Sequence, residues 1–185
     1  MANVDAPVGF WPIKSLSGDM PTPIEVYVDS SQAVNIGKGA VVTRESDGNV
    51  AFGGSSGTYD STKLAQCVGV VLGCFDSNRK PLKYLPSSTA GYLMVMPVKN
   101  VLFGCQSDGS VVQADIGVVR ALVYDNSVPC NTTTGNSTTE VSYTTSSNPV
   151  VKVLDKVNTP GNDWGTNVNL EVIFLVDGLN SSTGI

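Results

Sequence analysis

The sequence of 185 residues predicts an all-β fold. We expect a barrel or sandwich of about ten short antiparallel strands, with an extended N-terminal arm and long polar loops. Short runs of alternating or β-branched apolar residues recur along the chain, and clusters of Gly, Ser, Asn and Asp separate them. No stretch of about ten residues has the apolar periodicity of a helix. Only 15% of residues are charged, against about 25% in average domains, which suits strands joined by uncharged turns.

The apolar run 65–75 (AQCVGVVLGCF) is predicted to be a central strand. Alternation would place positions 68, 70, 72 and 74 on one face and positions 67, 69, 71, 73 and 75 on the other. Neither set is polar, so both faces are expected to be covered. Gly69 and Gly73 would then share a face and admit a close neighbour. A buried helix is the alternative, which the β-branched residues and the two glycines disfavour.

The remaining strands follow from shorter patterns. Asp47-Gly48-Asn49 predicts a hairpin turn, and Asp108-Gly109 predicts another turn. The region 115–124 is ambiguous between a helix and a strand. Further strands are expected at 24–28, 40–43, 50–52, 81–85, 92–96, 98–106, 150–157 and 169–176.

Residues 1–24 are expected to form an extended N-terminal arm, because four prolines exclude a helix and a central strand. The arm carries Phe10, Trp11, Ile13 and Leu16, which is too much apolar surface for a free tail. It should pack either on its own domain or on a neighbouring subunit, and the sequence leaves both alternatives open. We expect a single β domain at 25–178, including a polar excursion at 126–148, and a polar C-terminal tail at 179–185.

The charge pattern bears on possible partners. The formal net charge is −5, and the 11 Lys and Arg residues are scattered, so nucleic acid is not expected as a direct partner. No apolar run reaches the length of about 18 residues that a membrane helix needs, so no membrane partner is expected. The first residues do not resemble a secretory signal, and synthesis in a cytoplasm is therefore expected.

The sequence predicts neither catalytic residues nor a cofactor or metal site. The chain contains no histidine, which removes the usual Ser-His-Asp, Cys-His and His-based zinc arrangements. Its four cysteines show no C-x-x-C pair and are interpreted as reduced, structural thiols, with Cys130 the least apolar in context. Most acidic residues lie in turns, where Asp is favoured for local hydrogen bonds. Trp11 and Trp164 could stack on sugars if exposed, but packing anchors are the simpler interpretation.

Several short motifs together resemble a known family. The opening NVDAPVGFWPI from Asn3 is followed by Leu16-Ser-Gly, and VGVV from Val68 comes later. Three more motifs follow in order: VLFGCQSDG from Val101, ADIG from Ala114 and NTTTGNS from Asn131. Pro160-Gly-Asn-Asp and Asn167 precede the last strand. The order of these motifs is similar to that of the cement (decoration) proteins of tailed-phage capsids, notably those of cyanophages. The similarity departs around 44–62 and 142–150.

The resemblance implies a non-enzymatic virion protein on the outer capsid surface, bound between subunits of the major capsid protein. It also implies self-association, most simply as a homotrimer. As the interface with capsid or subunit we predict the apolar residues of the arm, namely Phe10, Trp11, Pro12, Ile13 and Leu16. The alternative is another virion component, such as a tail, vertex or host-attachment protein. An enzyme and an isolated carbohydrate-binding module are further alternatives.

Overall fold

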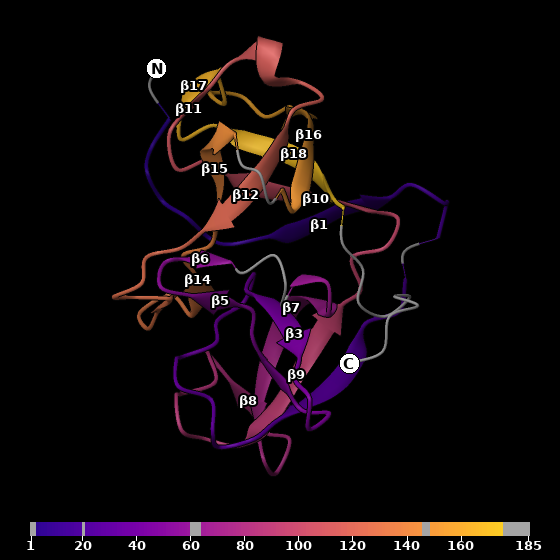
Figure 1. The fold of residues 1–185 in the computed structure, drawn as a ribbon, viewed down its shortest axis with the longest axis vertical. Helices are drawn as coiled ribbons and strands as arrows, with labels where there is room; N and C mark the ends of the chain where they lie inside the picture. Colours follow the sequence, from indigo (N-terminus) through magenta and orange to yellow (C-terminus); the bar gives the residue numbers. More distant parts are fainter. Residues whose placement is uncertain (1–2, 20, 60–63, 146–148, 176–185) are drawn as a thin grey trace.

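The computed structural model describes residues 3–19, 21–59, 64–145 and 149–175, and it has the predicted all-β architecture (Figure 1). The pairs between named strands are antiparallel, and most strands belong to two sheets. In Figure 1 most strands of the larger sheet lie in the upper part of the molecule and those of the smaller sheet in the lower part, with β1 crossing between them and β5 and β6 below β1.

The larger sheet, sheet A, has the order β1-β10-β18-β16-β12-β6-β5, with β15 also paired to β12. Its strands are β1 (Trp11–Ser15), β10 (Val101–Gln106), β18 (Asn169–Phe174), β16 (Val151–Lys156), β12 (Val119–Val123), β6 (Thr58–Tyr59), β5 (Gly54–Ser55) and β15 (Glu140–Thr145). The ambiguous region 115–124 is resolved as a strand, preceded by the 3₁₀ turn η1 (Gln113–Asp115). The polar excursion 126–148 contributes β15 to this sheet, and residues 146–148 lie outside the described residues.

The smaller sheet, sheet B, has the order β2-β9-β7-β3-β4, with β8 also paired to β7. Its strands are β2 (Ile24–Val28), β9 (Gly91–Met96), β7 (Cys67–Asp76), β3 (Val41–Arg44), β4 (Val50–Phe52) and β8 (Pro81–Leu82). Two small pairs complete the described fold: β11 (Ser110–Val111) with β17 (Gly165–Thr166), and β13 (Cys130–Asn131) with β14 (Asn136–Ser137).

Strand β7 confirms that the run 65–75 is a central strand covered on both faces near its start, because residues 67–71 are buried. The predicted alternation is wrong at two places. Thr43 pairs with Cys67 and Val42 with Gly69 across a register shift, so Cys67 and Gly69 do not share a face, and a second shift follows Val71. Val71 pairs with Val95 and Gly73 with Met94, so Val71 and Gly73 lie on opposite faces. The register shift between them inserts one residue, which reverses the facing of everything that follows.

A cluster of buried apolar residues joins both sheets. An aromatic group illustrates this contact: Phe52 of β4 packs against Tyr59 of β6 and against Tyr124, with ring centroids 5.4 and 4.9 Å apart. Offset and edge-to-face packing of such rings adds about 1 kcal/mol per pair beyond the burial of apolar area. The two sheets therefore share one hydrophobic core.

The cysteines belong to this packing. Cys67, Cys74, Cys105 and Cys130 are all buried, including Cys130 in its polar loop. Burial raises the pKa of the Cys74 thiol to about 12 and that of Cys130 to about 11. Protonated thiols of this kind are poor nucleophiles and behave as small apolar side chains.

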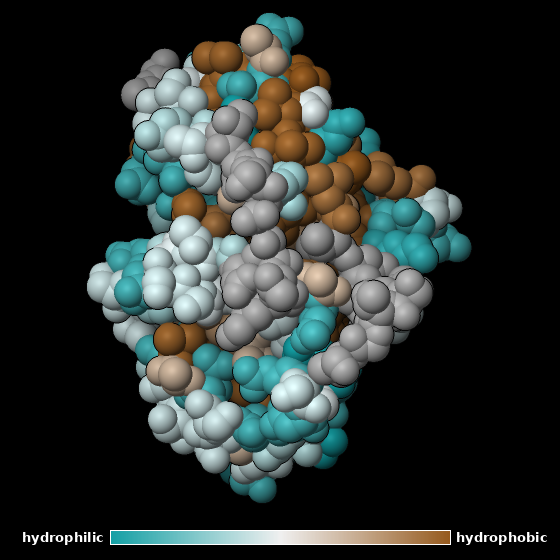
Figure 2. All heavy atoms as spheres, viewed as in Figure 1, coloured by the Kyte–Doolittle hydropathy of each residue, from teal (hydrophilic) through white to brown (hydrophobic). Residues whose placement is uncertain are grey.

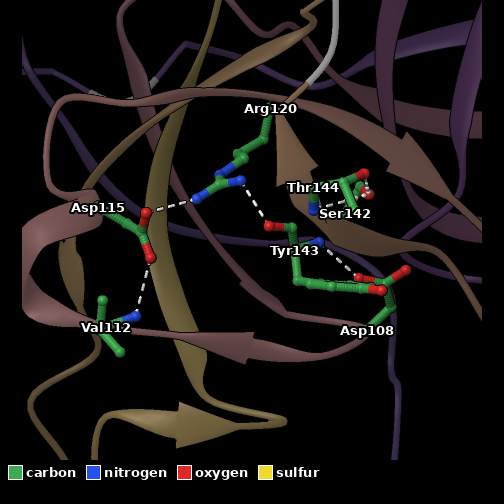
Figure 3. A network of polar contacts seen from close by, with 7 residues as sticks. All are labelled: Asp108, Val112, Asp115, Arg120, Ser142, Tyr143 and Thr144. Atoms are coloured by element: carbon green, nitrogen blue, oxygen red, sulfur yellow. Dashed lines mark hydrogen bonds and ion pairs between the residues drawn. The ribbon is translucent and has the colours of Figure 1, made fainter.

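A buried arginine fixes the upper end of sheet A (Figure 3). Arg120 of β12 donates to the Tyr143 carbonyl of β15 and forms an ion pair with Asp115 of η1, with Nη2 and Oδ1 2.6 Å apart. Asp115 also accepts from the Val112 amide, and Asp108 accepts from the Tyr143 amide. The network thus ties the 108–115 segment to two neighbouring strands.

Candidate interaction surface

The apolar part of the N-terminal arm is an edge strand of the chain's own sheet. β1 pairs with β10, so that Trp11 lies opposite Gly104, and Pro12 opposite Phe103. Proline has no amide hydrogen to donate, and an edge strand tolerates it because one side of the strand needs no partner. A register shift between Pro12 and Lys14 accommodates Ile13. Residues 11–15 of the predicted arm are therefore part of sheet A.

The five predicted interface residues differ in their exposure to solvent. Phe10 is only 3% exposed and packs on Phe103 and Phe174, with ring centroids 6.2 and 5.0 Å away. For Phe10 the first of the two open alternatives therefore holds, because its ring packs on the chain's own domain. Trp11, Pro12 and Ile13 are half-buried, and Leu16 is 52% exposed.

Trp11 and Pro12 form one wall of a shallow groove between the two sheets. The rest of the lining of this volume of about 270 Å³ comes from Val8, Phe10, Lys38, Gly39, Val71, Leu72 and Asn136. We call this site the arm groove. Val8 is 41% exposed, so the groove presents apolar surface to solvent beside a single lysine among these lining residues. Such a surface suits an apolar side chain of a protein partner.

The apolar surface continues over the outward face of sheet A. Val119, Ala121, Leu154 and Ile173 are half-buried, and Leu175 just after β18 is 47% exposed. Figure 2 shows a band of hydrophobic residues over the part of the molecule where these strands lie. Lys152 lies on the same face, in register between Val119 and Ile173, so the apolar residues flank a lysine. Exposed apolar residues grouped in this way commonly mark a contact with another macromolecule.

The free edge of β1 is not built for pairing with another strand. Pro12 lacks a donor, the register shift at Ile13 interrupts the ladder, and the Lys14 side chain is exposed. Natural edge strands use these devices to prevent edge-to-edge pairing. A partner at this end of sheet A would therefore contact side chains and not the backbone.

A second exposed cluster lies on the outward face of sheet B. Tyr27, Tyr92 and Phe75 are register partners across β2, β9 and β7, and Tyr27 is 43% exposed. Arg79 lies over the Tyr92 ring, 4.4 Å from its centroid, and forms an ion pair with Glu25 at 3.0 Å. Tyr and Arg are the residues that most often dominate binding energy at interfaces.

Sequence reasoning missed several residues of these surfaces. Leu72, Val8 and Lys38 join the arm groove only through the packing of β1 on β10 and of β7 beside it, which no local pattern encodes. Tyr27 had a usable signal, because it occupies an outward position of the alternating strand 24–28. Trp164 packs against the core, as the simpler interpretation of this residue required.

The described residues contain no group of three or more His, Cys, Asp or Glu side chains placed to hold a metal ion. Nor do they include a helix of sufficient length and apolarity to cross a membrane. Comparison of the chain with protein-family models, with curated proteins and with solved structures finds no match.

Proposed function

We propose that this chain is a non-enzymatic cement (decoration) protein of a tailed-phage capsid. In this proposal it binds the outer surface of the assembled head, between subunits of the major capsid protein, and stabilises the shell. The observation that carries the proposal is the exposed apolar surface formed by the arm groove and Leu16 on a rigid two-sheet body. The order of the sequence motifs supports the same assignment.

The physical role follows from mass action. A protein that binds only the assembled shell stabilises the shell by a free energy that grows with its concentration relative to Kd. A standard interface buries about 800 Å² on each partner, which is far more than the arm groove alone offers. We therefore propose that residues of the arm groove contribute most of the binding free energy, and that the outward face of sheet A provides the remaining contact area. Self-association as a homotrimer is part of the proposal.

The test uses particles that lack this protein and purified full-length chain added back to them. Val8→Ser together with Leu16→Ser removes exposed apolar groups without adding charge or touching the core. Loss of two such contacts is expected to weaken binding by about tenfold or more, at about 1 kcal/mol each. Capsid occupancy is measured by co-sedimentation over a titration.

Ile116→Ser is the matched control, because Ile116 is 44% exposed and lies in the turn between η1 and β12, outside the arm groove. Unchanged occupancy with the double variant, or an equal loss with the control, would remove the arm groove from the proposal. Deleting the arm is a weaker test, since it would also remove Phe10 from the core.

The outward face of sheet B favours a second candidate, a virion component that attaches to another surface through Tyr27, Tyr92 and Arg79. Copy number distinguishes the two functions. A cement protein covers the head in many copies, whereas an attachment protein is confined to a vertex or the tail. Quantitative mass spectrometry of purified particles measures this ratio.

A further inference from the structure

The first described residues of the chain form a strap across one side of sheet A. The Ala6 amide donates to Oε1 of Gln106 at 2.9 Å, and Gln106 Nε2 donates to the Val4 carbonyl at 2.9 Å. Asn3 donates to the carbonyls of Asp163 and Thr166 at 2.8 and 3.0 Å. We call residues 3–8 the N-terminal strap; in Figure 1 it runs from the N label down the side of the upper sheet toward β1.

The strap lies beside a group of three carboxylates. Asp5 sits between the two strap residues that bond to Gln106. The two residues that follow β10 lie against β15. Ser107 forms a bridge with Val141, and the Asp108 amide donates to the Val141 carbonyl at 3.0 Å. Glu140, the first residue of β15, is thereby brought together with Asp5 and Asp108, which both act on it electrostatically.

Glu140 is poorly suited to carry a charge at this position. Its Oε1 atom is buried and has no hydrogen-bond partner. A carboxylate with one buried oxygen that accepts no hydrogen bond is disfavoured in its charged form, whereas the neutral acid is tolerated. The charges acting on it are anionic, and the Cys105 thiol of β10, whose Sγ donates to the Thr139 carbonyl, lies nearby. Arg120 acts on Asp108, but it is bonded to Asp115 and to the Tyr143 carbonyl.

We propose that the N-terminal strap is a proton-controlled latch, closed while Glu140 is protonated and released when Glu140 and the neighbouring carboxylates are all charged. The step is a simple loss of one proton from the Glu140 carboxyl to solvent. The charged Glu140 then repels the Asp5 carboxylate. The strap relieves this repulsion when it leaves the sheet and carries Asp5 away from Glu140. The strap is held by two part-buried hydrogen bonds to Gln106 and by the exposed hydrogen bonds of Asn3, so a small number of bonds opposes its release.

The expected range of release is close to neutrality. Burial raises the pKa of Glu140 to about 7, with Asp5 and Asp108 adding to the effect. Burial also raises the pKa of Asp108 above its usual value. Release would open the groove of about 420 Å³ that the strap forms with Trp11, Gln106 and the loop 159–162. This inference concerns the chain alone and does not depend on the proposed capsid role.

The test is hydrogen exchange of the backbone amides of the full-length chain, with protection factors corrected for the intrinsic effect of pH. Between about pH 5.5 and 8.5, protection of the Ala6 amide is expected to fall by about tenfold more than that of the β7 amides, which report the change in global stability alone. Glu140→Gln mimics the protonated acid and should retain Ala6 protection at the higher pH. Glu45→Gln changes a half-buried residue of the turn between β3 and β4 in sheet B, and as the matched control it should behave as wild type.

Asp5→Asn provides a second variant that leaves the sheet intact. It removes the repulsion from the strap side, so protection of Ala6 should persist to higher pH. Constant protection of Ala6 in the wild type, or the same loss of protection in Glu140→Gln and Asp5→Asn as in the wild type, would overturn the latch.

Discussion

The indole of Trp11 lies directly against Gly104 on the neighbouring strand. The two residues are register partners between β1 and β10, and a Cβ atom added to Gly104 would overlap the six-membered ring of the indole. Because Gly104 has no side chain, the Trp11 indole can pack on its backbone and line the arm groove. The position of Trp11 therefore depends on glycine at residue 104.

Gly104→Ala is accordingly expected to displace Trp11 and to destabilise the fold by about 1–3 kcal/mol, the usual cost of overpacking. Denaturant unfolding and tryptophan emission measure the two effects. Gly73→Ala is the matched control, because a Cβ at Gly73 would meet Phe75 at an ordinary 3.6 Å. Wild-type stability and emission in Gly104→Ala would contradict this account of Trp11.

Phe10→Ala should cost about 3 kcal/mol of unfolding free energy, since the ring is 3% exposed and contacts Phe103 and Phe174. Leu16→Ala should cost less than about 0.5 kcal/mol, because Leu16 is 52% exposed. Chemical denaturation of both variants checks the contrast. Equal effects would mean that the arm is not integrated into the core as described.

The sequence was sufficient for the fold class and for many of its strands. β2 and β4 have the expected bounds, and the turn at Asp47-Gly48-Asn49 joins β3 to β4. These elements are encoded locally, by alternation and by turn residues. The facing of β7 beyond Val71 was not predictable in the same way, because the register shift that reverses it depends on pairing with β9.

The candidate site was predicted only in part, for a related reason. Apolar residues in a proline-rich segment indicate that the segment packs on something, but the pattern does not say which residues face inward. Phe10 and Trp11 are adjacent in sequence and both line the arm groove, yet Phe10 is buried in the core whereas Trp11 is half-buried. The choice depends on Gly104 and Phe103 of β10, nearly a hundred residues away.

Arg120→Met is expected to destabilise the fold by about 3 kcal/mol. The change removes the Arg120 donor from Asp115 Oδ1 and from the Tyr143 carbonyl, in a region where Arg120 itself is 4% exposed. Arg44→Met is the control. The Arg44 guanidinium donates an exposed hydrogen bond to the Gly48 carbonyl within the β3–β4 hairpin, so its loss should cost little.

A double variant separates the loss of a partner from the loss of packing. Arg120→Met with Asp115→Ala removes both charges, so it should be less destabilised than the sum of the single changes. Thermal or urea unfolding of the four proteins gives the coupling free energy. Strict additivity would mean that the ion pair does not contribute to the stability of this end of sheet A.

The stability of the whole chain should decline as pH rises through neutrality. The pKa of Glu140 is raised from 4.5 in the unfolded chain to about 7 in the fold, so the folded state binds this proton more tightly. The stabilisation is complete below about pH 4.5 and is lost as pH rises toward and through about 7. For a half-buried group we expect a loss of about 2 kcal/mol, less than the full shift would give because solvent screens part of it.

At acid pH the dependence is opposite, and the stability of the fold falls as pH decreases. Hydrogen bonds from Ser31 lower the pKa of Asp29, and those from Ser127 lower the pKa of Asp125, so both aspartates favour the fold only while they are ionised. Their contribution is lost as pH falls through their lowered pKa values, which places maximum stability in the mildly acidic range. Urea unfolding across this range measures the profile. Glu140→Gln should flatten its alkaline limb and leave the acid limb unchanged, and an unaltered alkaline limb would show that another group is responsible.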